Sequence, residues 1–401
     1  MKYLMVIGDG MADTFLPELQ GKTPLESLTL PHFDILAGSE LGTAKTVPEG
    51  VPAGSDTAIL NIFSYDPRRY FTGRSVLEAA GMGVFLKEGE ISFRMNLCGV
   101  EKGVMLSHNG GGIEGDEAET LMNDLIADPG FAEIAKKLSL HITVTRTFRH
   151  IGVINCPCEG EFMLKEPHNI LGEEYAPYLP KGALEKELTD LMLASFRCLD
   201  QHPINKARRA AGKLPANLIW PWGPGRAVQL PSFPEKYGHQ GDVISAVPLV
   251  WGIAGLAGLP APEVEGANGE LETNYEGKVE AALASLKNGA DFAAIHVEAP
   301  DEMTHAGDLP KKLEAIRRLD ERVIAPLLEK LPEIDPDFRL LLLSDHPTLM
   351  TTRTHDGAPV PFAIYDSRHP GTPKKFSERE AAKGPALPNG DLLMPRLFEL
   401  E

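Results

Sequence analysis

Short apolar runs that end in polar loops recur along this chain. They cover residues 3–7, 292–297, 340–343 and 361–365, and each is followed by a loop that contains an aspartate. Runs that are apolar at almost every position are typical of strands buried on both faces of a sheet. Residues 277–287 and 309–331 instead carry apolar side chains at three- and four-residue spacing, which predicts helices. The pattern therefore predicts an α/β fold, with helices covering both faces of the sheet.

The middle of the chain has a different pattern. Residues 91–106, 140–154 and 161–164 mix β-forming and polar positions, while residues 118–126 and 183–199 have helical spacing. An α+β segment of this kind, placed between two α/β halves, indicates an insertion. We expect the inserted domain to span residues 86–229 and the main domain to be formed by residues 1–85 and 230–401.

Composition and charge narrow the classes of partner. The 401 residues carry a formal net charge of -18, and no stripe of Lys and Arg runs along the sequence. Nucleic-acid backbones need such a stripe, so we expect no nucleic-acid partner. The apolar start is too short for a signal peptide or a membrane span, and the apolar stretch at 243–259 is broken by Pro248 and several glycines. These features predict a cytoplasmic protein with no membrane partner.

The cysteines support the same location. Cys98, Cys156, Cys158 and Cys198 are the four cysteines, and Cys156-Pro157-Cys158 is too tight for a CxxC redox or zinc motif. We expect reduced thiols, as in the cytoplasm.

Four polar clusters occupy loops where chemistry is favoured, because ligands of α/β sheets gather at the carboxyl ends of strands. Asp9 lies between two glycines after the first apolar run, and Ser55 follows Gly54 before a predicted helix at 56–63. Ser55 alone would be explained as a helix N-cap, but a helix N-terminus also favours an incoming phosphate.

The other two clusters lie in the last third of the chain. Asp301 and His305 are four residues apart and share one face of a helix, so they can converge on one ion. Asp345-His346 follows another apolar run, and His355 comes about ten residues later. Each residue alone has an ordinary structural explanation.

Taken together, these oxygen and nitrogen donors suit hard or borderline divalent ions and are numerous enough for two of them. Paired ions suit phosphoryl transfer, because they neutralise phosphoryl oxygens and activate a hydroxyl that is otherwise a poor nucleophile. The donors are Asp9, Ser55, Asp301, His305, Asp345, His346 and His355.

The ordered clusters resemble the alkaline phosphatase superfamily and, more closely, the archaeal-type 2,3-bisphosphoglycerate-independent phosphoglycerate mutases. The likeness covers nearly the whole chain. Its motifs include Gly21-Lys22-Thr23-Pro24-Leu25-Glu26, Gly54-Ser55-Asp56, Tyr70-Phe71-Thr72-Gly73-Arg74, Val264-Glu265-Gly266-Ala267, Val297-Glu298-Ala299-Pro300-Asp301-Glu302 and Asp345-His346. The resemblance implies an alkaline-phosphatase-like three-layer domain with an inserted α+β lid domain that excludes water.

The resemblance also implies roles for single residues. Ser55 would carry the phosphoryl group during interconversion of 3-phosphoglycerate and 2-phosphoglycerate, with Lys236 beside it. Two divalent ions are implied, Mn²⁺ first and Zn²⁺ or Mg²⁺ as alternatives. The implied ligands are Asp9, Ser55, Asp345 and His346 for one ion and Asp301, His305 and His355 for the other. Basic residues of the insertion, Arg94, Arg149, His168 and Arg226, would bind the small phosphorylated substrate.

Two departures from the family pattern leave the substrate open. Residues 220–226 replace a basic turn of the family, and residues 351–354 replace a small and acidic run. A homoserine-kinase-like phosphotransferase is therefore one alternative, and a metal-dependent phosphatase is another.

Overall fold

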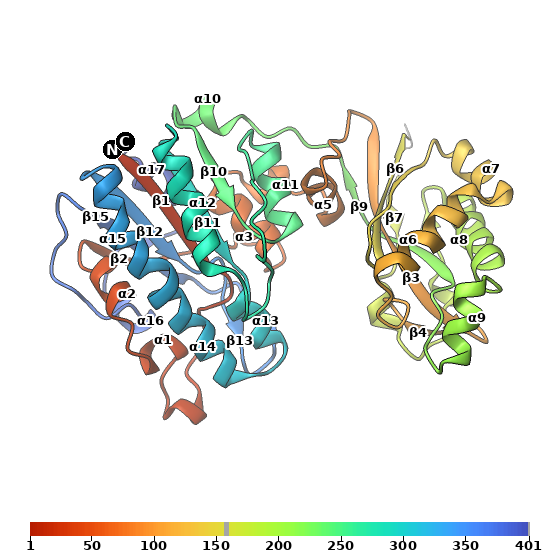
Figure 1. The fold of residues 1–401 in the computed structure, drawn as a ribbon, viewed down its shortest axis with the longest axis horizontal. Coiled ribbons are helices and arrows are strands. Elements are labelled where there is room, and N and C mark those ends of the chain that lie inside the picture. The colour runs from red at the N-terminus through yellow and green to blue at the C-terminus, as the bar shows by residue number, and fades with distance from the viewer. Residues whose placement is uncertain (156–159, 400–401) are drawn as a thin grey trace. The chain divides into compact units, whose positions relative to one another are not determined.

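The structure is a computed structural model and describes residues 1–155 and 160–399. The chain divides into two compact units (Figure 1), the first made of Met1–Phe71, Ala80–Met82 and Gln229–Glu401 and the second of Thr72–Ala79 and Gly83–Val228. The second unit therefore begins before the expected residue 86, because most of helix α5 (Arg74–Gly81) belongs to it. The chain leaves it at residue 228, against the expected 229.

A seven-stranded sheet forms the centre of the first unit. Its order is β10-β11-β1-β12-β15-β2-β16, and β10, β11, β1 and β12 run parallel. β15 runs antiparallel to β12. The strands are β1 (Lys2–Gly8), β2 (Glu40–Ala44), β10 (Gly241–Ile244), β11 (Phe292–Val297), β12 (Phe338–Leu343), β15 (Val360–Asp366) and β16 (Ala386–Leu387).

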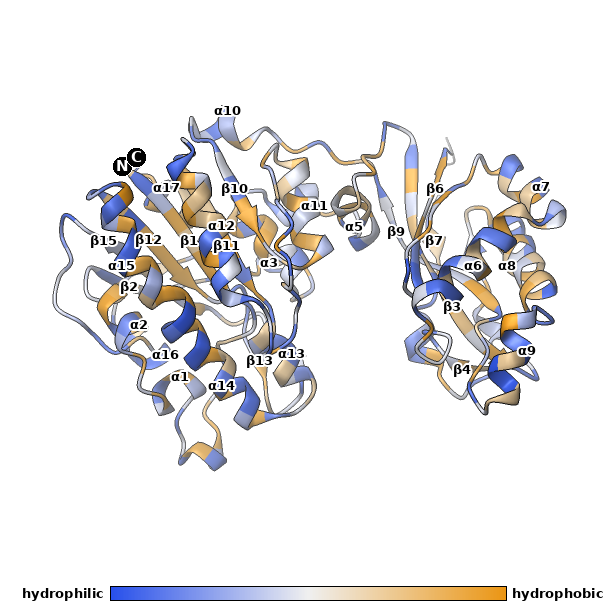
Figure 2. Cartoon of the chain, in the orientation of Figure 1, coloured by the Kyte–Doolittle hydropathy of each residue, from blue (hydrophilic) through white to orange (hydrophobic). Residues whose placement is uncertain are grey.

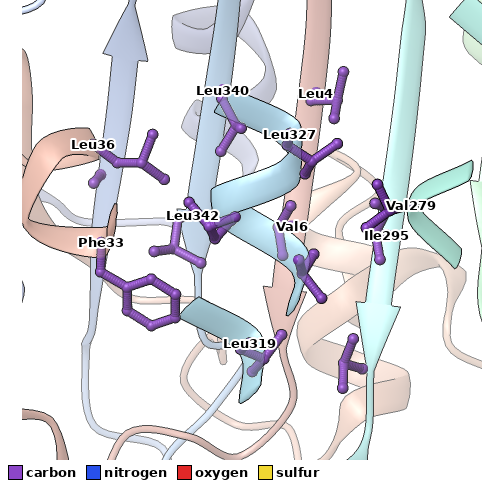
Figure 3. Packing of buried hydrophobic residues seen from close by; sticks show 14 of the residues in the cluster. Leu4, Val6, Phe33, Leu36, Val279, Ile295, Leu319, Leu327, Leu340 and Leu342 are labelled. Carbon is purple, nitrogen blue, oxygen red and sulfur yellow. The ribbon is translucent and has the colours of Figure 1, made fainter. Parts of the chain in front are cut away.

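Helices cover one face of this sheet and bury its alternate side chains. Leu4 and Val6 of β1 point to this face, as Leu340 and Leu342 of β12 do (Figure 3). Successive strand residues point to opposite faces, so each strand contributes side chains to the core on both sides of the sheet. The covering helices are α2 (Pro31–Leu36), α12 (Tyr275–Lys287), α14 (Leu309–Leu319) and α15 (Ala325–Ile334), with a π-helical turn at Asp320–Ile324.

Aromatic side chains mark the opposite face. Tyr3 packs edge-on against Phe398, with ring centroids 4.9 Å apart, and Phe233 stacks on Phe292 at 5.3 Å. Phe63, at the end of α3 (Ser55–Ile62), contacts both Phe233 and Phe292. The sheet thus lies between two helical layers, as predicted for the α/β class, and its central strands β1 and β12 are largely apolar (Figure 2).

The second unit is an antiparallel sheet with helices on one face. Strand β3 (Glu90–Glu101) pairs with β4 (Val104–Ser107), β6 (Arg149–Asn155) and β9 (Leu218–Arg226), and β5 (His141–Thr143) pairs with β6. Alternate residues of β3, such as Phe93 and Met95, pack against the helices. The helices are α6 (Gly115–Ala127), α7 (Pro129–Lys137), α8 (Glu185–Leu199) and α9 (Pro203–Ala210). The predicted α+β character of this segment is present.

Three helices predicted from the sequence are present in the structure. The helices predicted at 277–287, 118–126 and 183–199 are present as α12, α6 and α8. The thiols of Cys98 and Cys198 are free, whereas the expectation for Cys156 and Cys158 lies outside the described residues. Within residues 1–155 and 160–399, no helix is long and apolar enough to cross a membrane.

Candidate metal centre

Strand ends bring the predicted ligands to one edge of the seven-stranded sheet. Asp9 directly follows β1, and Asp345-His346 lies just beyond β12. Asp301 lies on α13 (Ala299–His305), which begins after β11. Because β1, β11 and β12 are parallel, their carboxyl ends meet at the same edge. β15 is antiparallel, so its amino end lies at this edge as well, and His355 precedes it.

Ser55 and three ligands form the first cluster. Ser55 is the first residue of α3, and its Oγ lies 3.3 Å from Asp9 Oδ2 and 3.2 Å from His346 Nε2. His346 Nε2 is 3.6 Å from Asp9 Oδ1 and 3.3 Å from Asp345 Oδ2. Asp9, Asp345 and His346 are almost fully buried. The structure therefore gathers all four residues expected around one ion.

Each carboxylate of this cluster offers one oxygen to the protein and leaves the other free. Asp9 Oδ2 accepts from His296 Nε2 at 3.0 Å, and Asp345 Oδ1 accepts from the backbone N–H groups of Gly10 and His346 at 3.1 and 2.9 Å. Asp9 Oδ1 and Asp345 Oδ2 are buried and have no hydrogen-bond partner among the described residues. Two orphaned, desolvated carboxylate oxygens are costly unless a cation binds them, so the site fits a metal ion.

The second cluster contains the other three predicted ligands. Asp301 Oδ2 lies 3.1 Å from His305 Nε2, and Asp301 Oδ1 lies 3.5 Å from His355 Nε2. The two imidazole Nε2 atoms are 3.0 Å apart. His305 Nδ1 lies 2.9 Å from the Arg353 carbonyl oxygen, and His355 Nδ1 lies 3.3 Å from that of Ala53. These outer partners turn both Nε2 atoms towards Asp301.

The two clusters share a boundary at His346. Its ligand atoms, with those of Asp9 and Asp345, lie within 4.8 Å of one another, and the same is true of Asp301, His346 and His355. His346 and His355 have ring centroids 4.2 Å apart. Carboxylate oxygens and imidazole nitrogens are donors that suit Mn²⁺, Zn²⁺ or Mg²⁺. The arrangement can hold two divalent ions side by side.

The electrostatics of the cluster favour a bound cation. Burial, together with the neighbouring Asp345 and Asp301, raises the pKa of Asp9 well above its usual value. Burial also opposes ionisation of Asp301, but hydrogen bonds from His305 and His355 lower its pKa. The bond to Asp301 raises the pKa of His305 to about 9. The ionised Asp301 carboxylate is thus stabilised by nearby positive charge, and a divalent ion would supply such charge.

Lys236 lies elsewhere, which corrects the expectation that it contacts Ser55. Its Nζ donates to the Ser64 carbonyl oxygen and lies over the rings of Tyr65 and Tyr237. Ser64 follows the C-terminal end of α3, about 12 Å along the helix from Ser55. The physical reason is topological: α10 (Phe233–Tyr237), which carries Lys236, precedes the parallel strand β10 and so lies near the amino edge of the sheet.

The second unit gathers basic side chains on the sheet face opposite helices α6, α7, α8 and α9. Glu78 of α5, which is buried, accepts from Arg94 Nε at 2.7 Å and from Arg94 Nη2. Arg74 Nε lies 3.4 Å and Arg149 Nη1 3.9 Å from Glu78 Oε1. Burial, then the repulsion of Arg94, lowers the pKa of Arg149 to about 10. Three guanidinium groups around one carboxylate leave an excess of positive charge, which favours an anion.

Of the other predicted substrate contacts, His168 lies near this cluster and Arg226 does not. Trp222 lies beneath the Arg94 guanidinium at 4.5 Å and edge-on to His168 at 5.5 Å, so His168 belongs to the same face. Arg226 does not: its Nη2 lies 3.4 Å from the Gly160 carbonyl oxygen, and its side chain is exposed. Arg94 is occupied by Glu78, whereas Arg149 Nε is buried without a partner among the described residues.

Sequence reasoning assigned no role to several residues of these sites. His296 and Thr348 are hydrogen-bonded to the ligands, and Arg74 belongs to the basic cluster. His296 gave a usable signal, because it is a lone polar residue in the apolar run 292–297. Arg74 and Glu78 are four residues apart, a spacing that predicts a helical ion pair. Thr348 gave no signal in the sequence, because its hydrogen bond to Asp301 depends on how two distant segments of the chain meet.

Known proteins match this chain over nearly its whole length. The model of the family "2,3-bisphosphoglycerate-independent phosphoglycerate mutase" matches residues 37–205. A Methanosarcina acetivorans protein of that name is 43% identical over 387 residues, 96% of each chain. A Geobacter sulfurreducens protein, named a probable 2,3-bisphosphoglycerate-independent phosphoglycerate mutase, is 41% identical over the full length of both chains.

Solved structures agree with the fold. A Pyrococcus horikoshii protein superimposes with a TM-score of 0.81 at 29% identity, covering 99% of this chain and 96% of its own. The cofactor-independent phosphoglycerate mutase of Thermoplasma acidophilum superimposes with a TM-score of 0.64 at 22% identity over the full length of both chains. At that identity the second likeness concerns the fold alone.

Proposed function

This chain belongs to the 2,3-bisphosphoglycerate-independent phosphoglycerate mutases, an isomerase family, and on that premise we propose that Ser55 carries the phosphoryl group during interconversion of 3-phosphoglycerate and 2-phosphoglycerate. The observation that carries the proposal is the position of Ser55 Oγ, 3.3 Å from Asp9 Oδ2 and 3.2 Å from His346 Nε2. The same cluster contains the two carboxylate oxygens that have no hydrogen-bond partner in the described part of the chain. A hydroxyl in this place is both exposed to reaction and held by ligand side chains.

The chain's own groups prepare Ser55 for transfer. Ser55 opens α3, so the first-turn N–H groups of this helix can receive phosphoryl oxygens. Asp9 Oδ2 and His346 Nε2 are the acceptors within reach of the hydroxyl proton. Asp9, Ser55, Asp345 and His346 would hold one divalent ion, and Asp301, His305 and His355 the other. When bound, such ions lower the pKa of a coordinated hydroxyl and neutralise the charge on phosphoryl oxygens.

Two transfers then complete the isomerisation. In the first, the Ser55 Oγ–P bond forms as the substrate's P–O ester bond breaks, and the released glycerate oxygen takes a proton. In the second, the other glycerate hydroxyl gives up its proton and attacks the phosphoserine, which breaks the Oγ–P bond and regenerates Ser55. Atoms and charges balance, and neither a nucleotide nor a bisphosphate is needed.

Anionic groups of the substrate require cations that the protein has not already neutralised. We assign this role in the second unit to Arg74 and Arg149, because Arg94 is committed to Glu78. We assign a hydrogen-bonding role to His168, because burial lowers its pKa and keeps the ring neutral. Arg94 then acts by positioning, since it lies between Glu78 and Trp222. The action of the second unit as a lid stays a prediction, as does a role for Arg226.

Two finer points complete the proposal. We propose Mn²⁺ as the ion, because mixed carboxylate and imidazole ligands suit it, with Zn²⁺ or Mg²⁺ as alternatives. A cytoplasmic location is proposed from the free thiols of Cys98 and Cys198, which are typical of a reducing compartment.

The test is Ser55→Ala, assayed with 3-phosphoglycerate in the presence of Mn²⁺. We expect kcat to fall by more than about three orders of magnitude, because the nucleophile is removed. Folding should be retained, since Ser55 accounts for only one side chain at the start of α3. Ser27→Ala is the control, because Ser27 Oγ donates to the Pro24 carbonyl oxygen and neither residue belongs to the ligand clusters.

Mass spectrometry of the wild-type protein, quenched during turnover, should show one phosphoryl group on Ser55. Substantial mutase activity in Ser55→Ala would overturn the proposal. Parallel reactions separate the alternatives: release of free phosphate without isomer would indicate a phosphatase, and ATP-dependent phosphorylation of homoserine a kinase.

A further inference from the structure

The Thr348 hydroxyl lies between the two ligand clusters. Thr348 is fully buried, and its Oγ1 is 2.5 Å from Asp301 Oδ1 and 3.1 Å from His346 Nδ1. Asp301 belongs to one proposed ion site and His346 to the other. We propose that Thr348 is a positioning residue that couples the two ion sites, by holding a ligand of each through one hydroxyl group. The inference rests on the proposal that these clusters bind two divalent ions.

Hydrogen counting fixes the direction of both bonds. A threonine hydroxyl has one hydrogen to donate, and an ionised carboxylate only accepts. Thr348 Oγ1 therefore donates to Asp301 Oδ1, and His346 Nδ1–H donates to Thr348 Oγ1. A neutral imidazole protonated on Nδ1 has a lone pair on Nε2, the atom that lies 3.2 Å from Ser55 Oγ. One hydroxyl thus sets the tautomer that His346 needs to bind an ion.

The backbone of Thr348 is held in place by a buried ion pair. Its N–H donates to the Ala12 carbonyl oxygen at 3.1 Å, and its own carbonyl accepts from Lys312 Nζ at 2.7 Å. Lys312 Nζ also bonds Asp13 Oδ2 at 2.8 Å, and both side chains are fully buried. Asp13 in turn accepts from the Met350 N–H at 3.1 Å. Both sides of the Thr348 turn are anchored, so its hydroxyl cannot follow one ligand without leaving the other.

Thr348 differs in this respect from the other outer partners. His296, supported by Ser245 Oγ at 3.1 Å, bonds Asp9 and so serves the first cluster. The Gly10 N–H serves Asp345 of the same cluster. Removing such a partner should lower the affinity of one ion site, because residues that hydrogen-bond to metal ligands typically contribute 10- to 100-fold to metal affinity. Removing the Thr348 hydroxyl should weaken both ions together.

The experiment compares three variants as metal-free protein titrated with Mn²⁺ in a calorimeter. Thr348→Val keeps the shape and removes the hydroxyl, and we expect both dissociation constants to rise, each about 10- to 100-fold. Thr348→Ser restores the hydroxyl and should return both constants to within a few-fold of the wild type. Thr46→Val is the matched control: Thr46 is also fully buried, but its Oγ1 has no hydrogen-bond partner among the described residues.

A second measurement reads the His346 tautomer directly. Nitrogen-15 NMR of the histidines in the metal-free wild type should show His346 protonated on Nδ1, and the resonance should move in Thr348→Val. An Nε2-protonated His346 in the wild type would overturn the inference, as would a folded Thr348→Val that binds two Mn²⁺ ions with unchanged affinity. Loss of only one site in that variant would also refute coupling. A wild type that binds no Mn²⁺ would instead refute the proposed ion sites themselves.

Discussion

Replacing Glu78 with glutamine tests the electrostatic organisation of the second unit most directly. Glu78→Gln keeps the size of the side chain but removes the carboxylate that lies beside three guanidinium groups. The carboxylate is buried and accepts two hydrogen bonds from Arg94, with Arg74 and Arg149 within 4 Å. The variant leaves Arg94 buried without its counter-charge, and the glutamine N–H₂ now faces guanidinium donors.

The size of the effect follows from burial. Removing one partner of a buried ion pair typically costs about 3 to 5 kcal/mol, because the remaining charge is desolvated and unpaired. With a urea slope of roughly 2 kcal/mol per M, the midpoint for the second unit should fall by about 1.5 to 2.5 M. An exposed pair of the same unit, Glu133 with Lys137, should show no comparable shift in Glu133→Gln.

Tryptophan fluorescence gives the assay. The chain has three tryptophans, and two of them, Trp220 and Trp222, lie in β9 of the second unit. Trp222 is in contact with Arg94, so its emission reports the region that the substitution disturbs. Inorganic phosphate should stabilise Glu78→Gln more than the wild type, because the variant has a larger excess of positive charge.

A midpoint shift below about 0.5 M would refute the reasoning, since roughly 1 kcal/mol is the value of an exposed pair. A full shift without any response to phosphate would separate the two parts of the argument. The ion pair would then matter for folding, but the cluster would not bind anions.

Three further predictions concern other charged groups. Lys312→Met should destabilise the first unit by about 3 to 5 kcal/mol in thermal unfolding, because it leaves the buried Asp13 carboxylate without its counter-charge. The double variant Lys312→Met/Asp13→Leu should recover part of the lost stability. An unchanged stability of Lys312→Met would contradict the contribution of this buried pair. Burial lowers the pKa of His150 to about 4, so the unfolded state takes up a proton at higher pH than the folded state. Stability of the second unit should therefore fall by about 2 kcal/mol from pH 7.5 to pH 5 in urea titrations, and His150→Gln should remove this slope. Arg149→Gln should raise KM for 3-phosphoglycerate about 10- to 100-fold with little change in kcat, in steady-state assays; a fall in kcat alone would contradict a binding role.

The grouping of the predicted metal ligands could be expected from the sequence, because their positions follow from local pattern and one topological rule. An apolar run followed by Asp9, and another by Asp345, places both carboxylates at strand ends, and parallel strands bring those ends together. Ser55 was predictable from the Gly-Ser pair before a helical pattern. The sequence also showed the two-unit organisation, because apolar periodicity changes in the middle of the chain.

Long-range features were not predictable in this way. An apolar run looks the same in either direction, so the antiparallel course of β15 could not be read from residues 361–365. The predicted contact of Lys236 with Ser55 was wrong, because a local motif does not show at which edge of the sheet its helix begins. The pairing of Arg94 with Glu78 depends on how α5 meets β3, and the sequence pattern of either element does not contain that.

The order of the strands has a consequence for how the protein is made. β1 occupies the interior of the sheet, and its hydrogen-bonding neighbours are β11, which starts at Phe292, and β12, which starts at Phe338. On the ribosome, the strand that ends in Asp9 emerges long before either neighbour exists, whereas residues 83–228 of the second unit are contiguous and can collapse first. During synthesis β1 is therefore an apolar strand whose backbone is not yet paired. Such a segment is prone to aggregation and is a suitable substrate for chaperones. The proposed pair of ion sites is complete only once synthesis has passed His355, so a product truncated before this residue would lack one of the proposed ligands.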